Sequence, residues 1–124
     1  MTHSTLSISA YNSYSKALYE LAEESKILDQ IEDQVSALNN LISESNDFIS
    51  TIKNPTLKQE DLLDIISLIS EKFGFNQLFK KFINFLIFKR RIFYIENILN
   101  DFLRICSNKR GEIEAKLISA KKLD

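Results

Sequence analysis

The feature that most constrains this sequence is its shortage of helix-breaking residues, with two glycines and one proline in 124 residues. Because glycine and proline are the strongest interruptions of local structure, long helices with short links are favoured over many short strands. Apolar residues also recur at helical spacing through most of the chain, as in Ile31, Val35, Leu38 and Ile42. That spacing is typical of one face of an α-helix. We therefore predict an all-α fold.

Local capping signals predict where several helices begin and end. Thr56 and Gln59 have the spacing of a capping box before the fourth helix. Gly74 stands where a left-handed residue would end that helix, and Asn76 is a favourable N-cap for the next one. The fourth helix should therefore lie between the capping box and Gly74. The other five are expected over about residues 7–24, 26–44, 48–52, 77–89 and 91–107.

The last part of the chain departs from this helical pattern. Over residues 112–117 polar and apolar side chains alternate, which is the period of a half-buried strand. No similar run lies upstream, and even an isolated hairpin is only marginally stable in water. We therefore predict a six-helix bundle as the N-terminal domain over residues 1–107. Residues 108–124 then form a separate segment with a strand-like pattern and no partner strand upstream, with the boundary expected at residues 108–111.

The inventory of reactive side chains predicts no enzyme activity. His3 is the only histidine and lies near the N-terminus, so a Ser-His or Cys-His nucleophile pair is not expected. Cys106 is the only cysteine and falls in an apolar helical stripe, where a buried core position is expected. No residues have the spacing of metal ligands, and neither glycine belongs to a phosphate-binding loop. We predict no catalytic residue, no metal and no cofactor.

Charge and hydropathy leave two alternative functions open. The formal net charge is −1, which does not favour a broad phosphate-binding surface. Five basic residues nevertheless suggest a helical nucleic-acid-binding protein as one alternative: Lys80, Lys81, Lys89, Arg90 and Arg91. A free-standing helical adaptor is the other. The longest apolar stretch, residues 82–88, is far shorter than the roughly 20 residues that span a membrane.

The helix expected over residues 77–89 carries more apolar surface than one face of a surface helix needs. Its apolar side chains form two stripes, one with Leu78, Phe82, Phe85 and Leu86 and the other with Phe79, Ile83 and Ile87. Two explanations are open. The helix is either central and buried on all sides, or it forms one wall of a surface groove for a partner's amphipathic helix. In the second case the first helix, with Ala10, Tyr14 and Ala17, could be the other wall.

Three stretches of the sequence together resemble one protein family. Residues 14–22, YSKALYELA, resemble the opening helix motif of the delta subunit of F-type ATP synthases, the oligomycin-sensitivity-conferring protein of mitochondria. Residues 82–86, FINFL, followed by Arg91, are similar to the fifth helix and basic turn of that family. Residues 111–120, GEIEAKLISA, resemble the hinge and first strand of its second domain. The resemblance therefore implies that residues 1–107 are the N-terminal domain and that residues 108–124 are the hinge and first strand of a truncated C-terminal domain, which lacks its partner domain.

The resemblance implies a function as well as a fold. It implies a non-catalytic stator subunit that links the catalytic head to the peripheral stalk and supports proton-driven ATP synthesis. In the family, the N-terminal helix of an alpha subunit binds between the first and fifth helices. Carried over by position, Tyr14 and Ala17 would lie on one wall and Phe85 on the other. Helical spacing adds four further residues to this predicted partner-binding set: Ala10, Leu18, Phe82 and Leu86.

The resemblance also implies a second partner and a location. The b-type stalk subunit would bind through the family's C-terminal domain. Through the complex, the chain would be peripheral to a membrane, at the cytoplasmic face of a bacterial inner membrane or the matrix face in an organelle. The sequence departs from the family at two places. Ser15 replaces a more usual Ala, and Lys89-Arg90 replaces the usual Asn-Gly before the basic residue.

Overall fold

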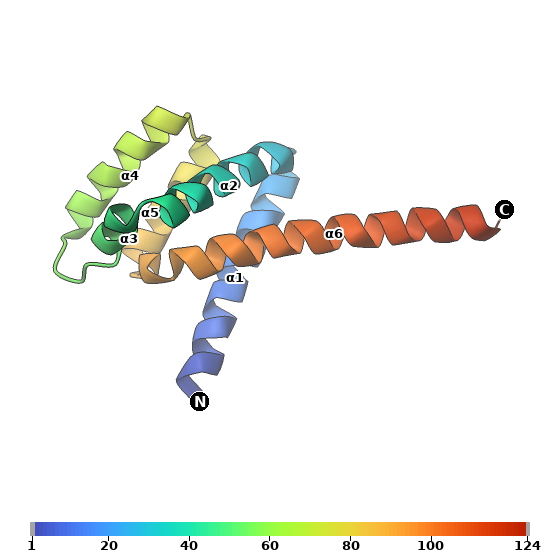
Figure 1. Ribbon diagram of the computed structural model, residues 1–124, viewed down its shortest axis with the longest axis horizontal. Coiled ribbons are helices and arrows are strands. Elements are labelled where there is room, and N and C mark those ends of the chain that lie inside the picture. Colours follow the sequence, from blue (N-terminus) through green and yellow to red (C-terminus); the bar gives the residue numbers. More distant parts are fainter. Residues whose placement is uncertain (1, 124) are drawn as a thin grey trace.

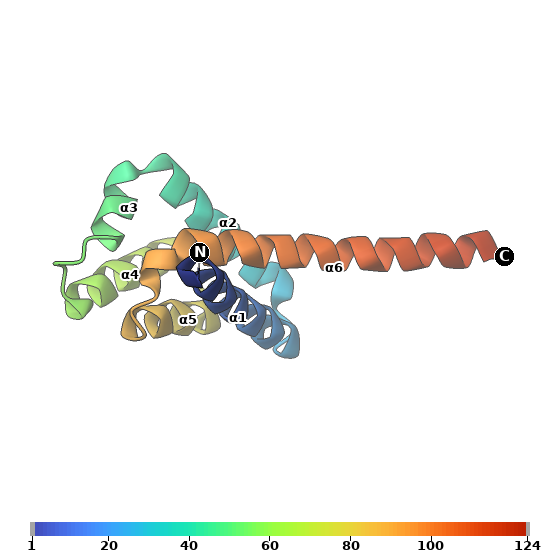
Figure 2. The same ribbon diagram turned by 90° about the horizontal axis from the view of Figure 1, so that it is seen from below.

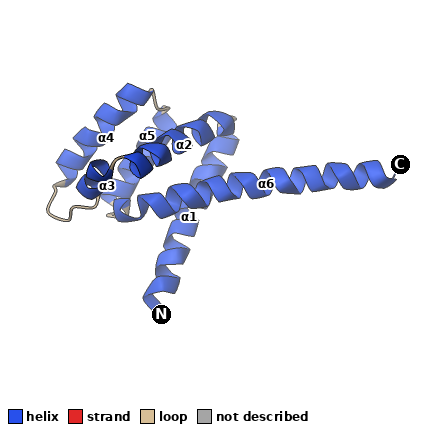
Figure 3. Cartoon of the chain, in the orientation of Figure 1, coloured by secondary structure: helices blue, strands red, loops and turns tan. Residues whose placement is uncertain are grey.

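The computed structural model describes the backbone of residues 2–123 and the side chains of residues 12–113. Within that backbone the chain forms six α-helices and one short 3-10 helix, and no strand (Figures 1 and 3). In chain order these are α1 (Thr2–Glu24), α2 (Leu28–Glu44), α3 (Asn46–Ile52), α4 (Gln59–Phe73), α5 (Gln77–Phe88), η1 (Ile92–Tyr94) and α6 (Ile95–Leu123). The predictions of an all-α fold and of six helices are confirmed.

All six α-helices and η1 contribute buried side chains to the hydrophobic core, and most of these lie on α1, α2, α5 and the first part of α6. Phe79 of α5 and Phe102 of α6 are the largest side chains that are completely buried. The helices α1 and α6 cross (Figure 1), and the Ser15 hydroxyl donates a hydrogen bond of 3.0 Å to the carbonyl oxygen of Ile98 at their buried contact. Ser15 therefore links two helices that are far apart in the sequence.

The segment predicted to be strand-like is helical, so that prediction is wrong. The helix α6 runs from Ile95 to Leu123 without a break at residues 108–111, and its C-terminal part extends beyond the other helices (Figure 2). A lone strand would leave its backbone N–H and C=O groups unpaired, whereas a helix pairs them within one segment. Glu, Ala, Lys and Leu are also strong helix formers. The division into residues 1–107 and 108–124 stays a prediction.

Three helices end in the same way, with one residue in the left-handed conformation. These residues are Lys26 after α1, Gly74 after α4 and Arg90 after α5, with φ of 60°, 65° and 58°. The N–H of the next residue donates back into the last turn, from Ile27 to Ala22, Phe75 to Ser70, and Arg91 to Leu86. This is the Schellman motif, in which glycine is the usual residue. The prediction for Gly74 is confirmed, and Lys26 and Arg90 adopt this conformation although neither is glycine.

Of the two N-terminal capping predictions, one is confirmed and one is wrong. The Asn76 side chain accepts a hydrogen bond of 2.8 Å from the Leu78 N–H at the start of α5, as predicted. Thr56 does not cap α4, because its hydroxyl and its N–H both donate to the side chain of Asn54, at 2.7 and 3.0 Å. Asn54 thus holds a separate turn before the helix, and α4 begins only at Gln59.

Candidate partner-binding groove

An apolar groove lies between α1 and α5. It has a volume of about 470 Å³ and is lined by Tyr14, Ala17 and Leu21 from α1 and by Leu78, Lys81, Phe82 and Phe85 from α5. Most of these residues follow one another at spacings of three or four along their helix, which places their side chains on one face, and Lys81 lies directly before Phe82 at its edge. Lys81 is the only charged residue among the seven. The surface that the two helices present together is therefore almost entirely apolar.

Aromatic side chains define the shape of the groove. The rings of Tyr14 and Phe85 meet across it edge to face, with centroids 6.0 Å apart and planes at 63°. Phe85 is 45% exposed and Leu21 is 46% exposed, while Phe82 is only 6% exposed. Phe82 therefore belongs mostly to the core, and Phe85 and Leu21 present apolar surface to the outside. Apolar side chains grouped in this way are characteristic of interaction sites.

The seven residues predicted to bind a partner occupy different places in the structure. Tyr14, Ala17, Phe82 and Phe85 all line the groove. Leu18 and Leu86 do not reach it, because both side chains are completely buried in the core. Each directly follows a groove residue, and successive helical residues point about 100° apart. Ala10 lies in α1, before the residues whose side chains the structure describes.

Sequence reasoning left three lining residues out of the predicted set: Leu21, Leu78 and Lys81. Leu21 follows Ala17 by four positions, and Leu78 precedes Phe82 by four, so helical spacing could have included both. Lys81 could not be included in the same way, because a charged residue does not continue an apolar stripe even though it lies four residues before Phe85. Only its position beside the groove identifies it.

The structure excludes one of the two explanations for the apolar excess of α5, and binding of a partner helix stays a prediction. Phe79, Ile83 and Ile87 form the core side of the helix and are at most 1% exposed. Phe85 and Phe88, in contrast, are 45% and 60% exposed. The helix is therefore not buried on all sides. It has one core face and one face that contributes to the groove.

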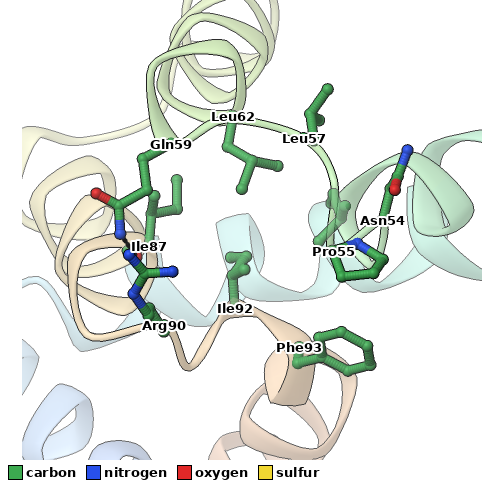
Figure 4. A pocket seen from close by; sticks show the side chains of 10 residues that line it. Asn54, Pro55, Leu57, Gln59, Leu62, Ile87, Arg90, Ile92 and Phe93 are labelled. Atoms are coloured by element: carbon green, nitrogen blue, oxygen red, sulfur yellow. Dashed lines mark hydrogen bonds between the residues drawn. The ribbon is translucent and has the colours of Figure 1, made fainter.

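A second, smaller pocket lies between the α3–α4 loop, the end of α5 and η1 (Figure 4). Its volume is about 200 Å³. On one side the Gln59 amide donates a hydrogen bond of 3.1 Å to the carbonyl oxygen of Ile87, near Arg90. Pro55 and Phe93 lie on the other side. The hydrogen bond fastens the start of α4 to the end of α5, which gives this region a structural role.

The titratable groups near the α1–α6 contact are perturbed mainly by burial. Cys106 is almost completely buried, as predicted, and burial, together with the nearby Glu32 carboxylate, raises the pKa of its thiol to about 11. Burial and the neighbouring Glu23 also raise the pKa of Tyr19 above its usual range. A thiol that stays protonated at neutral pH is a poor nucleophile. Cys106 therefore acts as a core residue.

The described residues show neither a metal-binding cluster nor a membrane-spanning helix. They contain no group of three or more His, Cys, Asp or Glu side chains placed to hold a metal ion. Within the same part of the chain, none of the helices combines the length and the apolar character needed to cross a membrane. The groove is thus the best-defined candidate for a functional surface among these residues.

Comparison with known proteins decides the family. The family described as ATP synthase delta (OSCP) subunit matches residues 10–124. The chain belongs to this family. An ATP synthase subunit delta of Pelagibacter ubique is 52% identical over 110 residues, which are 89% of this chain and 60% of that protein. One from Rhodospirillum rubrum is 32% identical over 107 residues, which are 86% of this chain and 58% of that protein.

The family includes a mitochondrial protein as well as bacterial ones. ATP synthase subunit 5, mitochondrial, of Schizosaccharomyces pombe is 32% identical over 112 residues, which are 90% of this chain and 52% of that protein. The chain therefore spans between 52% and 60% of the length of these curated relatives. The family match over residues 10–124 covers all the residues of α1 and α5 that line the groove.

Proposed function

We propose that this chain acts in a non-catalytic stator subunit of an F-type ATP synthase. Its membership of the delta (OSCP) subunit family supports this role. In this proposal the six helices form a rigid bundle that binds the N-terminal helix of an alpha subunit and helps to hold the catalytic head against rotor torque. The subunit as a whole links that head to the peripheral stalk and supports proton-driven ATP synthesis without catalysing a reaction itself.

The observation that carries the alpha-subunit part of the proposal is the apolar groove between α1 and α5. Its α5 wall runs from Leu78 to Phe85, a distance of about 10 Å at the helical rise of 1.5 Å per residue. A groove of that length accommodates about two turns of a partner helix, which would contribute apolar anchors three or four residues apart. Apolar burial suits a stator, because a contact that resists torque needs slow dissociation and exposed ion pairs contribute little.

The remaining parts of the proposal concern partners outside the groove. The b-type stalk subunit is expected to bind the part of the family's length that these residues do not span. Through that complex the chain would be peripheral to a membrane, at the cytoplasmic face in bacteria or the matrix face in an organelle. Nucleic-acid binding has less support, because Lys81 lines the groove and Arg90 lines the small pocket. The basic residues therefore do not all contribute to one surface.

The test is the binding of a synthetic peptide with the N-terminal sequence of the alpha subunit. We expect the peptide to become helical on binding, measured by circular dichroism, and to be weakened by Phe85→Asp. The substitution would bury an unpaired charge in an apolar groove, at a cost of about 2 to 4 kcal/mol in binding free energy. Phe88→Asp is the matched control, because Phe88 lies on the same helix, is 60% exposed and does not line the groove.

Two outcomes would contradict the proposal. One is an absence of peptide binding by the wild-type chain, measured by isothermal titration calorimetry. The other is an equal loss of affinity in Phe85→Asp and Phe88→Asp, which would mean that the groove is not the binding surface. Urea denaturation of both variants would show whether either loss arises from unfolding instead.

A further inference from the structure

Two lysines give the groove a positive charge on one side only. Lys81 lines the α5 wall, and the Lys89 ammonium lies 5.7 Å from the centroid of the Phe85 ring. We propose that the helix bound in this groove carries acidic side chains along the α5 edge of its apolar face, about two turns apart. This inference rests on the proposed function, since it describes the chemistry of the partner helix at the same site.

The spacing of the acidic side chains follows from the positions of the lysines. Lys81 and Lys89 are eight residues apart on one helix and its C-cap, which corresponds to about 12 Å along the axis at 1.5 Å per residue. A partner helix lying along α5 would meet both cations with carboxylates seven or eight residues apart. Residues at that spacing lie on the same face of a helix, because they are separated by two turns.

The opposite wall does not neutralise this charge. The residues of α1 that line the groove are Tyr14, Ala17 and Leu21, none of which is charged. The charged residues Lys16, Glu20 and Glu23 of the same helix line a different hollow, between α1 and α6. Among the residues that line the groove, the one charged side chain therefore belongs to α5, and it favours carboxylates on one edge of the partner.

Lys89 is also held in a position that favours charge recognition. Its ammonium group lies over the ring of Phe85, which is itself exposed in the groove, and the face of an aromatic ring attracts a cation. A partner helix that covers Phe85 removes water from this lysine as well. Partial desolvation strengthens the attraction between the ammonium group and a carboxylate beside it.

The test compares two forms of the alpha-subunit N-terminal peptide. One has the natural sequence, and in the other every Glu and Asp is replaced by Gln or Asn. We expect the natural peptide to bind about three to ten times more tightly at low salt, as for two largely exposed ion pairs. We expect this ratio to fall below about two in 1 M NaCl, where charges are screened beyond about 3 Å.

Variants of the chain locate the effect. In a Lys81→Gln/Lys89→Gln double variant the two peptides should bind equally, while Lys80→Gln should keep the full ratio. Lys80 is the matched control, because it lies on α5 but does not line the groove. Equal binding of the two peptides to the wild-type chain would overturn the inference but not the proposed function. The same conclusion would follow if the alpha-subunit peptide contained no acidic residues. Absence of binding by both peptides would overturn the proposed function and the inference with it.

Discussion

The two halves of α6 are one continuous helix, but they are stabilised in different ways. The packed half, residues 95–106, has a buried row made of Ile95, Ile98, Leu99, Phe102 and Cys106. The projecting half, residues 107–123, extends past the other helices (Figure 2), and every side chain described in it, over residues 107–113, is exposed. The first half is held by burial, whereas none of the described side chains of the second half is buried.

One ion pair marks the point where α6 leaves the other helices. The Arg110 guanidinium donates to the Glu32 carboxylate of α2 at 2.8 Å. Beyond it, Ile113 is 59% exposed and is not part of the buried core. The comparison teaches that a helix can have the same backbone throughout while tertiary packing stabilises only part of it. Changes in the two halves should therefore have very different effects on the free energy of unfolding.

The largest effect is expected from a cavity in the packed half. Phe102 is completely buried and its ring lies 6.3 Å from that of Tyr19. Phe102→Ala should lower the free energy of unfolding by about 3 to 5 kcal/mol, because it loses apolar burial and leaves a cavity. Ile113→Ala should change it by less than about 0.5 kcal/mol, as for other exposed sites. Urea denaturation of both variants measures the difference, and a similar cost for the two would remove the distinction between the halves.

A smaller effect should appear at alkaline pH and should also come from the packed half. Burial raises the pKa of Cys106 from 9.0 to about 11, so the folded chain keeps a proton that the unfolded chain has lost in that range. The resulting stability is fully present below pH 9 and is lost as the pH rises to about 11. The maximum loss is about 2 to 3 kcal/mol, at 1.36 kcal/mol per pKa unit.

The control for this pH dependence is Cys106→Ala, which has no thiol to ionise. Other groups also titrate above pH 9, including Tyr19, whose pKa is raised as well. The contribution of Cys106 is therefore the difference between the unfolding curves of the two proteins from pH 8 to 11. Parallel curves would show that the pKa of the Cys106 thiol is the same in the folded and unfolded chains.

The smallest effect is expected in the projecting half and tests its helical structure. Gly111 lies inside α6 with nothing within 4 Å of an added Cβ, so Gly111→Ala should stabilise the local helix by up to about 1 kcal/mol. Gly74→Ala should instead destabilise the chain by about 1 kcal/mol, because Gly74 has a φ of 65°. Hydrogen exchange of the amides of residues 108–113 measures the first change, and urea denaturation measures the second. Faster exchange in Gly111→Ala would argue against a helix there.

Much of the fold could be predicted because it depends on contacts within one or two helical turns. The apolar spacing predicted six helices, Gly74 and Asn76 predicted helix ends, and the two stripes of α5 predicted either full burial or a groove. The helical conformation of residues 112–117 was missed, because a short alternating pattern was given more weight than the helix propensity of Glu, Ala, Lys and Leu. Lys26 and Arg90 were missed as left-handed residues, since neither is glycine or asparagine.

Local patterns in the sequence were enough to predict the helices up to residue 107 and the apolar side chains on more than one face of α5. Only the tertiary structure decided which of these side chains are available to a partner. Ala17 and Phe85 line the groove, while their neighbours Leu18 and Leu86 are in the core. The reason is that periodicity is a local property of the chain, whereas burial depends on where distant helices cross. The contact that fixes α1 against α6 joins Ser15 to Ile98, 83 residues away.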